Sequence, residues 1–336
     1  DSSPEGSGSP LDGPTPTDSP TPTDELPLSP ADREAFEAVL AGEEPGPLAV
    51  VGAPFAGRER LLDHASERLD ATRIRLAPGD GVDAVGDAIG ERPVVVDDCH
   101  HLYRRTIGGF DSLETVLDRV VDADAPVVAG WNRYAWAYLS AVRTLDRAFP
   151  TRVDVGPATA ERLAELLLSR YDELPSFVDD DAGESGLVGI RRFTFDWGER
   201  SLSIPVPVPS SLSASRRGTP PDPKDVVFER LAAVSEGNVG VATAIWGRGD
   251  VVRPSDVAAP GGDLSLDRDE AFCLRVVLSK ERVDRAELAA VVGADLDRIL
   301  SRLVRDGLVT VADGVVALDP AAVPTAAAAT ERRRFP

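Results

Sequence analysis

The chain has 336 residues, with 57 acidic and 36 basic side chains and a formal net charge of −21. This length can bury a sizeable core and favours more than one domain. No apolar run reaches the roughly 18 residues of a membrane span and no signal-peptide pattern opens the chain, so we expect a cytoplasmic protein. Only Lys224 and Lys280 are lysines, and acid-rich, lysine-poor sequences are typical of haloarchaeal-type proteins in molar salt. In such salt, charges are screened within about 3 Å. The negative net charge therefore does not exclude nucleic acid as a partner.

The N-terminal half predicts a tail followed by an α/β core. Residues 1–30 are dominated by Pro, Ser, Thr, Asp and Gly, and such a segment buries too little apolar area to order itself, which predicts a disordered tail. Over residues 31–175, short apolar runs alternate with helical stretches, the pattern of a doubly wound parallel five-stranded sheet. The expected strands are 48–52, 72–77, 93–98, 126–130 and 152–155, and the expected helices are 32–40, 58–69, 82–89, 112–121, 134–148 and 158–171.

Residues 176–225 interrupt this alternation. Ile190–Trp197 and Ser201–Val208 each alternate apolar and polar residues around a short turn, which predicts a β-hairpin. The prolines of the second run restrict it to an edge strand. Two interpretations stay open for this insertion: it packs its apolar face on its own domain, or it docks a partner. A Pro- and Ser-rich linker completes the segment.

The C-terminal part predicts a helical lid and a second small domain. Residues 226–250 hold two helices that break at Gly237-Asn238. Residues 264–320 show three helical stretches and a small hairpin, which together predict a winged helix-turn-helix. The helical stretches are 267–280, 285–292 and 296–306, and the hairpin strands are 308–311 and 314–318. Residues 321–336 are expected to form a loose tail.

The turn after the first strand has the spacing of a phosphate-binding loop. Such a loop aims backbone N–H groups at an anion, and the helix that follows adds its positive end. Gly52 and Gly57 match the glycines of G-x-x-x-x-G-K-[ST], with Pro54 between them. Arg58 stands at the Lys position, where it can still pair with phosphate without being equivalent. Glu59 places a carboxylate at the position of the metal-binding hydroxyl. These five residues are our candidates for nucleotide contact.

The buried strand 93–98 ends on two carboxylates. In the functional interpretation Asp97 holds Mg²⁺ through water and Asp98 polarises the attacking water. In the alternative, the paired aspartates only cap the strand and the turn after it. Asn132 follows the next strand, where it could touch a γ-phosphate or orient water. It could equally cap the helix that begins there.

Four segments carry a family resemblance: GAPFAGRE, VVVDDCHHL, VVAGWN and SEGNVGVATAIW. Together they resemble the AAA+/STAND superclass of P-loop ATPases, over Leu48 to about Arg248. The resemblance implies a sheet of order 5-1-4-3-2 with a helical lid, a winged helix after the lid, and ATP with Mg²⁺ as the ligands. Arg58 and Glu59 depart from its pattern, and the departure argues against hydrolysis more strongly than against binding.

In a winged helix-turn-helix, the last of the three helices, here within 294–306, is the presumed recognition helix. It carries Arg298, Arg302 and Arg305 among several aspartates. A DNA-reading helix is usually basic on one face, so DNA contact and a protein-interaction role both stay open.

Our leading hypothesis is an AAA+/STAND-like regulatory protein that binds ATP and signals through the winged helix. The alternatives are a catalytically inactive pseudo-ATPase scaffold and a winged-helix transcriptional regulator, and homo-oligomerisation stays open.

Overall fold

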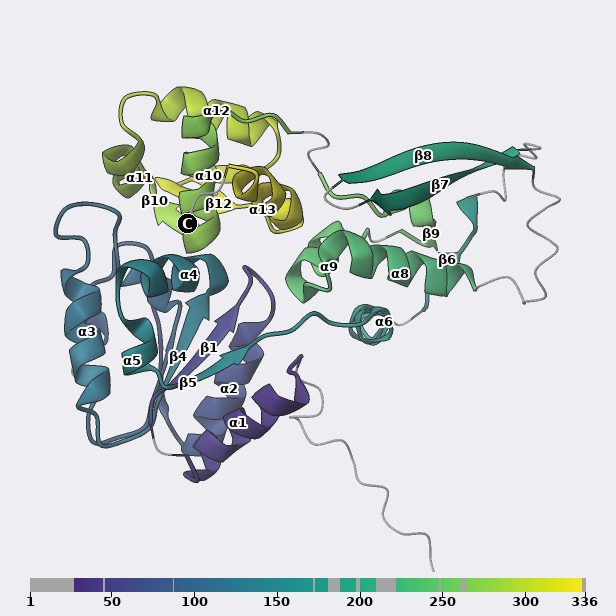
Figure 1. The fold of residues 1–336 in the computed structure, drawn as a ribbon. Helices are drawn as coiled ribbons and strands as arrows, with labels where there is room; N and C mark the ends of the chain where they lie inside the picture. Colours follow the sequence, from purple (N-terminus) through teal and green to yellow (C-terminus); the bar gives the residue numbers. More distant parts are fainter. Residues whose placement is uncertain are drawn as a thin grey trace, which may run out of the picture.

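The computed structural model describes residues 27–333, apart from 45, 87, 172, 181–187, 198–199, 210–221, 248 and 261–263; within 188–209 it describes the backbone. Most of the predicted tail 1–30 therefore lies outside the described residues. Figure 1 shows an α/β core, a helical lid beside it, and a C-terminal module (residues 264–333) that lies over one edge of the core sheet.

The core is built on five parallel strands in the order β2-β3-β4-β1-β5. This confirms the predicted doubly wound α/β fold and the order 5-1-4-3-2. The residues of β1, β3 and β4 are all buried, because strands covered on both faces need nearly continuous apolar runs. The strands are β1 (Leu48–Gly52), β2 (Thr72–Arg75), β3 (Val94–Asp97), β4 (Val127–Asn132) and β5 (Thr151–Asp154).

Helices cover both faces of this sheet. On one face α1 (Pro30–Ala41) and α2 (Arg58–Leu69) share an apolar cluster with alternate strand residues such as Val50 and Val95. The other face carries α3 (Asp111–Val121), α4 (Arg133–Val142) and α5 (Leu145–Ala148), which pack on the remaining alternate residues. β1 and β4 end at the edge over which the C-terminal module lies (Figure 1), and the other strands of the sheet run parallel to them. Ligands of open α/β sheets bind outside this carboxyl edge.

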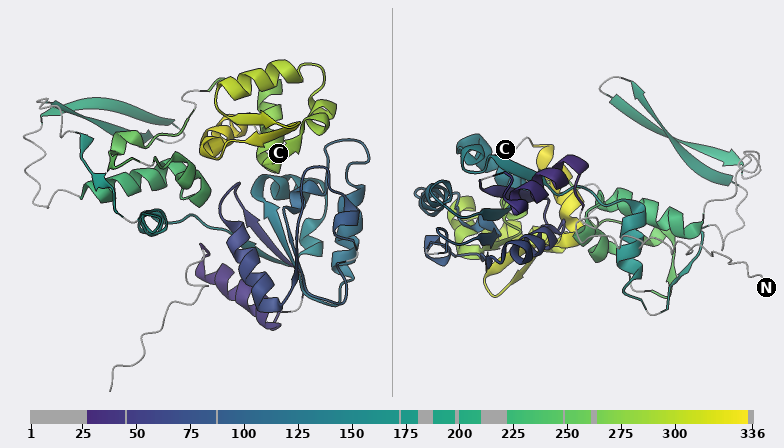
Figure 2. Two further views of the ribbon diagram at one scale, coloured as in Figure 1. Left: turned by 180° about the vertical axis from the view of Figure 1, so that it is seen from behind. Right: turned by 90° about the horizontal axis from the view of Figure 1, so that it is seen from below.

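The lid and the hairpin follow β5. The lid consists of α6 (Ala160–Leu168), α8 (Pro223–Ser235) and α9 (Val239–Ile245), with the short parallel pair β6 (Ser176–Phe177) and β9 (Val251–Val252) and the turn η5 (Pro254–Asp256). β7 (Val188–Trp197) and β8 (Arg200–Pro209) pair antiparallel over the segments of the predicted hairpin, with Trp197 opposite Arg200. Figure 2 shows this hairpin standing clear of the core. Docking of a partner by this hairpin stays a prediction.

The C-terminal module combines helices with a three-stranded sheet of order β10-β12-β11. Its elements are α10 (Arg268–Lys280), β10 (Arg282–Asp284), α11 (Arg285–Val292), α12 (Leu296–Arg305), β11 (Val309–Ala312), β12 (Val315–Leu318), η6 (Pro320–Ala322) and α13 (Val323–Glu331). The order of helices and strands agrees with the predicted winged helix-turn-helix, which remains a prediction. Among the described residues no helix has the length and apolarity to span a membrane.

Three local expectations differ from the structure. The expected helix 82–89 is one turn, η2 (Val82–Ala84), because glycines at positions 81, 86 and 90 weaken a helix there. The expected helix 134–148 is interrupted at Arg143, whose backbone is extended. The expected loose tail 321–336 is wrong over most of its length, because α13 packs on α10. Its run of alanines combines the strongest helix propensity with small side chains that allow close packing.

Candidate functional site

The loop between β1 and α2 keeps the shape that its glycines predicted. Gly57 caps α2 with φ 87°, a left-handed conformation that favours glycine. Phe55 also has a positive φ, 61°. At Gly52 a Cβ would come within 3.3 Å of Val155 and 3.6 Å of the Cβ of Arg58. The turn therefore presents the start of α2, with its free N–H groups, to the carboxyl edge of the sheet.

The lid holds this loop directly. Asn238 at the start of α9 donates its Nδ2 hydrogen to the carbonyl of Pro54 at 2.8 Å, and the N–H of Gly240 donates to the carbonyl of Phe55 at 3.0 Å. A Cβ at Gly240 would overlap Phe55, so only glycine permits this approach. The start of α9 in the lid is therefore hydrogen-bonded to the loop between β1 and α2, although Asn238 and Pro54 lie 184 residues apart in the sequence.

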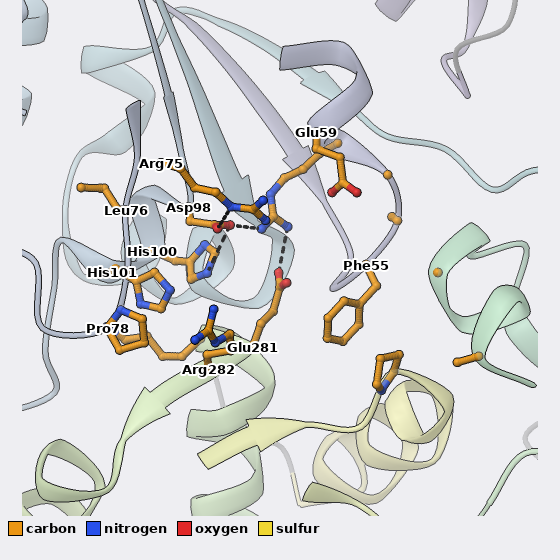
Figure 3. A pocket seen from close by; sticks show the side chains of 18 of the residues that line it. Phe55, Glu59, Arg75, Leu76, Pro78, Asp98, His100, His101, Glu281 and Arg282 are labelled. Atoms are coloured by element: carbon orange, nitrogen blue, oxygen red, sulfur yellow. Dashed lines mark hydrogen bonds and ion pairs between the residues drawn. The ribbon is translucent and has the colours of Figure 1, made fainter. Parts of the chain in front are cut away.

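Arg58, at the position of the usual lysine, is turned toward the edge of the sheet and is buried. Its Nη2 donates to Asp98 and its Nη1 donates to Glu281 Oε1 at 2.8 Å (Figure 3). Its Nε lies 3.4 Å from Asp97 Oδ1. Burial alone would lower the pKa of Arg58, but Glu281, Asp98 and Asp97 outweigh it and raise the pKa above its ordinary value. The guanidinium is therefore charged and bridges three carboxylates.

The two aspartates after β3 are held by further arginines. Asp97 accepts from the backbone N–H of Asp98 at 2.7 Å and lies 3.5 Å from Nη2 of Arg73. Asp98 accepts from Nε of Arg75 at 3.0 Å. Burial alone would raise the pKa of Asp98, but Arg58 and Arg75 outweigh it and lower the pKa below its ordinary value. Three guanidinium groups thus hold Asp97, Asp98 and Glu281 in one network of ion pairs at the edge of the sheet. Arg73 also pairs with the exposed Asp63.

Asn132 caps α4, which was one of the two interpretations of this residue from the sequence. Its Oδ1 accepts the backbone N–H groups of Tyr134 at 2.8 Å and Ala135 at 3.4 Å, which caps α4. Its Nδ2 then faces the C-terminal module, where it donates to the carbonyl of Leu278 at 3.0 Å and to Glu281 Oε1 at 3.1 Å. The role at a γ-phosphate stays a prediction, but the structure does bring Asn132 and Arg58 to one carboxylate.

These residues do not fit Mg²⁺ in the observed arrangement. A Mg²⁺ site needs carboxylate and hydroxyl oxygens that are free to turn toward the metal or its waters. Oxygens of Asp97 and Asp98 already accept from guanidinium groups. Glu59 is exposed and takes no part in the ion pairs of Figure 3. Within the part of the chain that is described, no group of three or more His, Cys, Asp or Glu side chains could hold a metal ion. The metal role of Asp97 remains a prediction without support from this geometry.

A cavity of about 520 Å³ adjoins the network. The core, the lid and the C-terminal module all line it, with Phe55, Glu59, Arg75, His100, His101 and Arg282 among its side chains (Figure 3). Burial lowers the pKa of both histidines below the ordinary value of 6.5, that of His101 to about 3. Both imidazoles are therefore neutral at pH 7. This volume lies within the range of small-molecule sites.

Two of the three arginines predicted to contact DNA already have partners. Arg298 and Arg302 pair with Glu270 at 3.3 and 3.0 Å, and Glu270 is fully buried at the start of α10. Arg305 is exposed. Sequence reasoning missed Glu270, although Asp267 and Glu270 have the spacing of the capping box that they form. DNA contact by α12 stays a prediction.

Sequence reasoning also missed the end of α10. Buried Lys280 donates its Nζ hydrogen to the carbonyl of Tyr103, lies 4.2 Å from the centre of the Tyr103 ring, and pairs with Glu287 at 3.4 Å. Burial lowers the pKa of Lys280 to about 8. One available signal was rarity, since Lys280 is one of only two lysines. No local pattern singled out Glu281.

Comparisons with known proteins yield similarities of fold at low identity. No protein-family model matches the chain, and no curated protein matches it. Among solved structures, the chain is similar to the RuvB Holliday junction branch migration motor of Thermotoga maritima, with a TM-score of 0.36, 13% identity, and coverage of 89% of this chain and 95% of that one. It is also similar to the Aeropyrum pernix ORC1 protein in complex with DNA, with a TM-score of 0.36, 15% identity, and coverage of 90% and 93%. For the Aeropyrum pernix ORC2 protein the values are 0.35, 11%, 92% and 96%. Likeness at this level establishes no shared activity.

Proposed function

We propose that this protein is an AAA+/STAND-like pseudo-ATPase, a regulatory or assembly protein that uses an ATPase-like fold without hydrolysing ATP. The observation that carries the proposal is the position of Arg58, which donates to Asp98 and Glu281 and lies against Asp97. An internal guanidinium stands where an ATPase of this class would need a lysine and a metal ion.

The chemistry of phosphoryl transfer supports this conclusion. Such catalysis depends on a metal that bridges the phosphates and on a side chain that positions the attacking water. Asp97 and Asp98 are the candidates for both roles, and their oxygens accept hydrogen bonds from arginines and from the backbone. Position 59 supplies a carboxylate instead of a hydroxyl. Metal chelation and water activation therefore both compete with a preformed network of ion pairs.

ATP binding with and without Mg²⁺ tests the proposal. Calorimetric titration of the full chain in molar KCl should show that Mg²⁺ does not increase the affinity for ATP, and that Asp97→Ala does not reduce it. The reason is that no metal bridges Asp97 to the phosphates. Saturable binding that requires Mg²⁺ and is lost in Asp97→Ala would overturn the proposal.

A second candidate function is favoured by the cavity beside the loop. Its volume of about 520 Å³ and its position next to Gly57 and Arg58 suit a nucleotide held without metal by the N–H groups at the start of α2. In this version ATP binds and biases the C-terminal module between two arrangements. Metal-independent ATP binding that Arg58→Ala abolishes would select this regulator, and the absence of ATP binding would select the scaffold.

A further inference from the structure

Four successive residues at the end of α10 contact the core. The carbonyl of Leu278 accepts from Asn132, and Ser279 Oγ lies 3.4 Å from the hydroxyl of Tyr103. Lys280 donates to the carbonyl of Tyr103, and Glu281 accepts from Arg58. The C-terminal end of a helix favours nearby cations, so the end of α10 is favourably placed next to the guanidinium of Arg58. The module is thus attached at the carboxyl edge of the sheet, where ligands of such sheets bind.

Glu281 contacts both of the core residues that the sequence proposed for phosphate contact, Arg58 and Asn132. Its Oε1 accepts from Arg58 Nη1 at 2.8 Å and from Asn132 Nδ2 at 3.1 Å. Asn132 is fully buried and its amide is oriented by its cap on α4, so its donor points at this position whether or not Glu281 is there. A single carboxylate oxygen therefore lies where the pair would bind an oxyanion.

The backbone of Glu281 is strained. Its φ of 59° and ψ of −44° lie outside the common regions for a residue with a side chain. Two hydrogen bonds hold it there: its N–H donates to Val277 in α10 at 2.7 Å, and its carbonyl accepts from Leu318 in β12 at 2.8 Å. Strained residues of this kind persist only where the surroundings hold them, and they cluster at clamps and switches.

We propose that Glu281 is a built-in anionic ligand of Arg58 and Asn132, and that a diphosphate group competes with it for this pair without a metal ion and releases the C-terminal module from the core. The shared donors support competition. Arg58 Nη1 and Asn132 Nδ2 both donate to Glu281 Oε1, so withdrawal of Glu281 leaves both donors free for an oxygen of another anion. The inference rests on the second candidate function and deepens it, because it names the contact through which a phosphate ligand acts on the module.

Pyrophosphate in EDTA and molar KCl is the probe, applied to the full chain. Glu281→Gln keeps the size of the side chain and removes its charge. Asp295→Asn is the matched control, because Asp295 is an exposed carboxylate of the same module whose side chain makes no capping hydrogen bond. Pyrophosphate affinity is measured by calorimetry, and attachment of the module by hydrogen exchange of the backbone amides of α10 and β10.

The proposal predicts faster exchange in α10 and β10 for Glu281→Gln than for wild type or Asp295→Asn. It also predicts tighter pyrophosphate binding, by about tenfold if Glu281 fills the site nine-tenths of the time. In wild type, saturating pyrophosphate should speed the same exchange. If Glu281→Gln fails to fold, Glu281→Gly serves instead, because glycine adopts the positive φ without strain.

Equal exchange in wild type and Glu281→Gln would overturn the proposal. So would equal pyrophosphate affinity, no saturable binding in either protein, or wild-type exchange that pyrophosphate leaves unchanged. Neither Mg²⁺ nor ATP enters this experiment. A metal-dependent ATPase activity would therefore refute the proposed function and leave this result unaffected.

Discussion

Replacement of Arg58 by alanine should destabilise the core strongly. The Arg58 side chain is 5% exposed, and the three carboxylates around it are 1%, 12% and 12% exposed. Removal of one partner from a buried ion pair costs about 3–5 kcal/mol, because the remaining charges are left uncompensated. For a domain of this size each kcal/mol lowers the melting temperature by about 2–4 °C, which predicts a decrease of roughly 6–20 °C.

The loss should depend on pH in a defined direction. Without Arg58, burial raises the pKa of Asp98 and of Glu281 in the folded state, because Arg58 is the main charge that opposes it. A carboxyl group with a raised folded pKa loses stability as pH rises through the window between its unfolded and folded values. The variant should therefore be less destabilised at pH 5 than at pH 7.

Scanning calorimetry at the two pH values measures both effects. Arg58→Lys should fall between wild type and Arg58→Ala, because an ammonium keeps the charge without the planar fork of donors. Arg60→Ala is the control: Arg60 is exposed on the same helix, and such substitutions change stability by about 0.5 kcal/mol or less. A melting temperature of Arg58→Ala equal to that of Arg60→Ala would refute the reasoning.

Three further predictions concern the lid, the histidines and α12. Gly240→Ala should destabilise by about 1–3 kcal/mol, because its Cβ overlaps Phe55, whereas Gly247→Ala meets open space and should leave the melting temperature unchanged. Stability should fall as pH decreases from 6.5, by about 1.4 kcal/mol per pH unit for each of His100 and His101, because the unfolded state takes up protons that the folded state refuses. Denaturant titrations should show a smaller decrease in stability per pH unit in His101→Gln than in wild type. Glu281, whose pKa burial raises, opposes this decrease in both proteins. A pH dependence unchanged by the substitution would contradict the assignment. Arg302→Ala should cost about 1–3 kcal/mol in thermal unfolding, because buried Glu270 loses a charged hydrogen bond, and equal melting of Arg302→Ala and exposed Arg305→Ala would contradict this.

The core was predictable because its signals are local. Val94–Val96 and Val127–Val128 are apolar runs that only a doubly covered strand tolerates, and they occur as β3 and β4. The cap at Asn132 was predictable for the same reason, since its partners are two and three residues away. In the segment 82–89, glycines oppose the helix that the apolar spacing predicted, and the structure has a single helical turn there.

The site was predictable only in part, because its decisive contacts are long-range. Arg58 reaches Asp97 and Asp98 from 39 and 40 residues away, and Glu281 from 223. The loop pattern showed that lysine was missing, but no pattern indicated that the arginine would turn from the loop to the aspartates. Glu281 belongs to another part of the chain, and only the docking of α10 places it against the core. Spacing along the sequence therefore indicated which residues to expect at the carboxyl edge of the sheet, and only the tertiary structure shows the contacts that they make.

Magnesium-dependent phosphate release from ATP tests the central claim most directly. Wild type should release phosphate no faster than Asp98→Asn in molar KCl with Mg²⁺, because Arg58 holds both carboxylates. The double variant Arg58→Lys/Glu59→Thr, which restores the residues of an active loop, provides the matched comparison. Turnover by wild type that requires Mg²⁺ and disappears in Asp98→Asn would contradict the account.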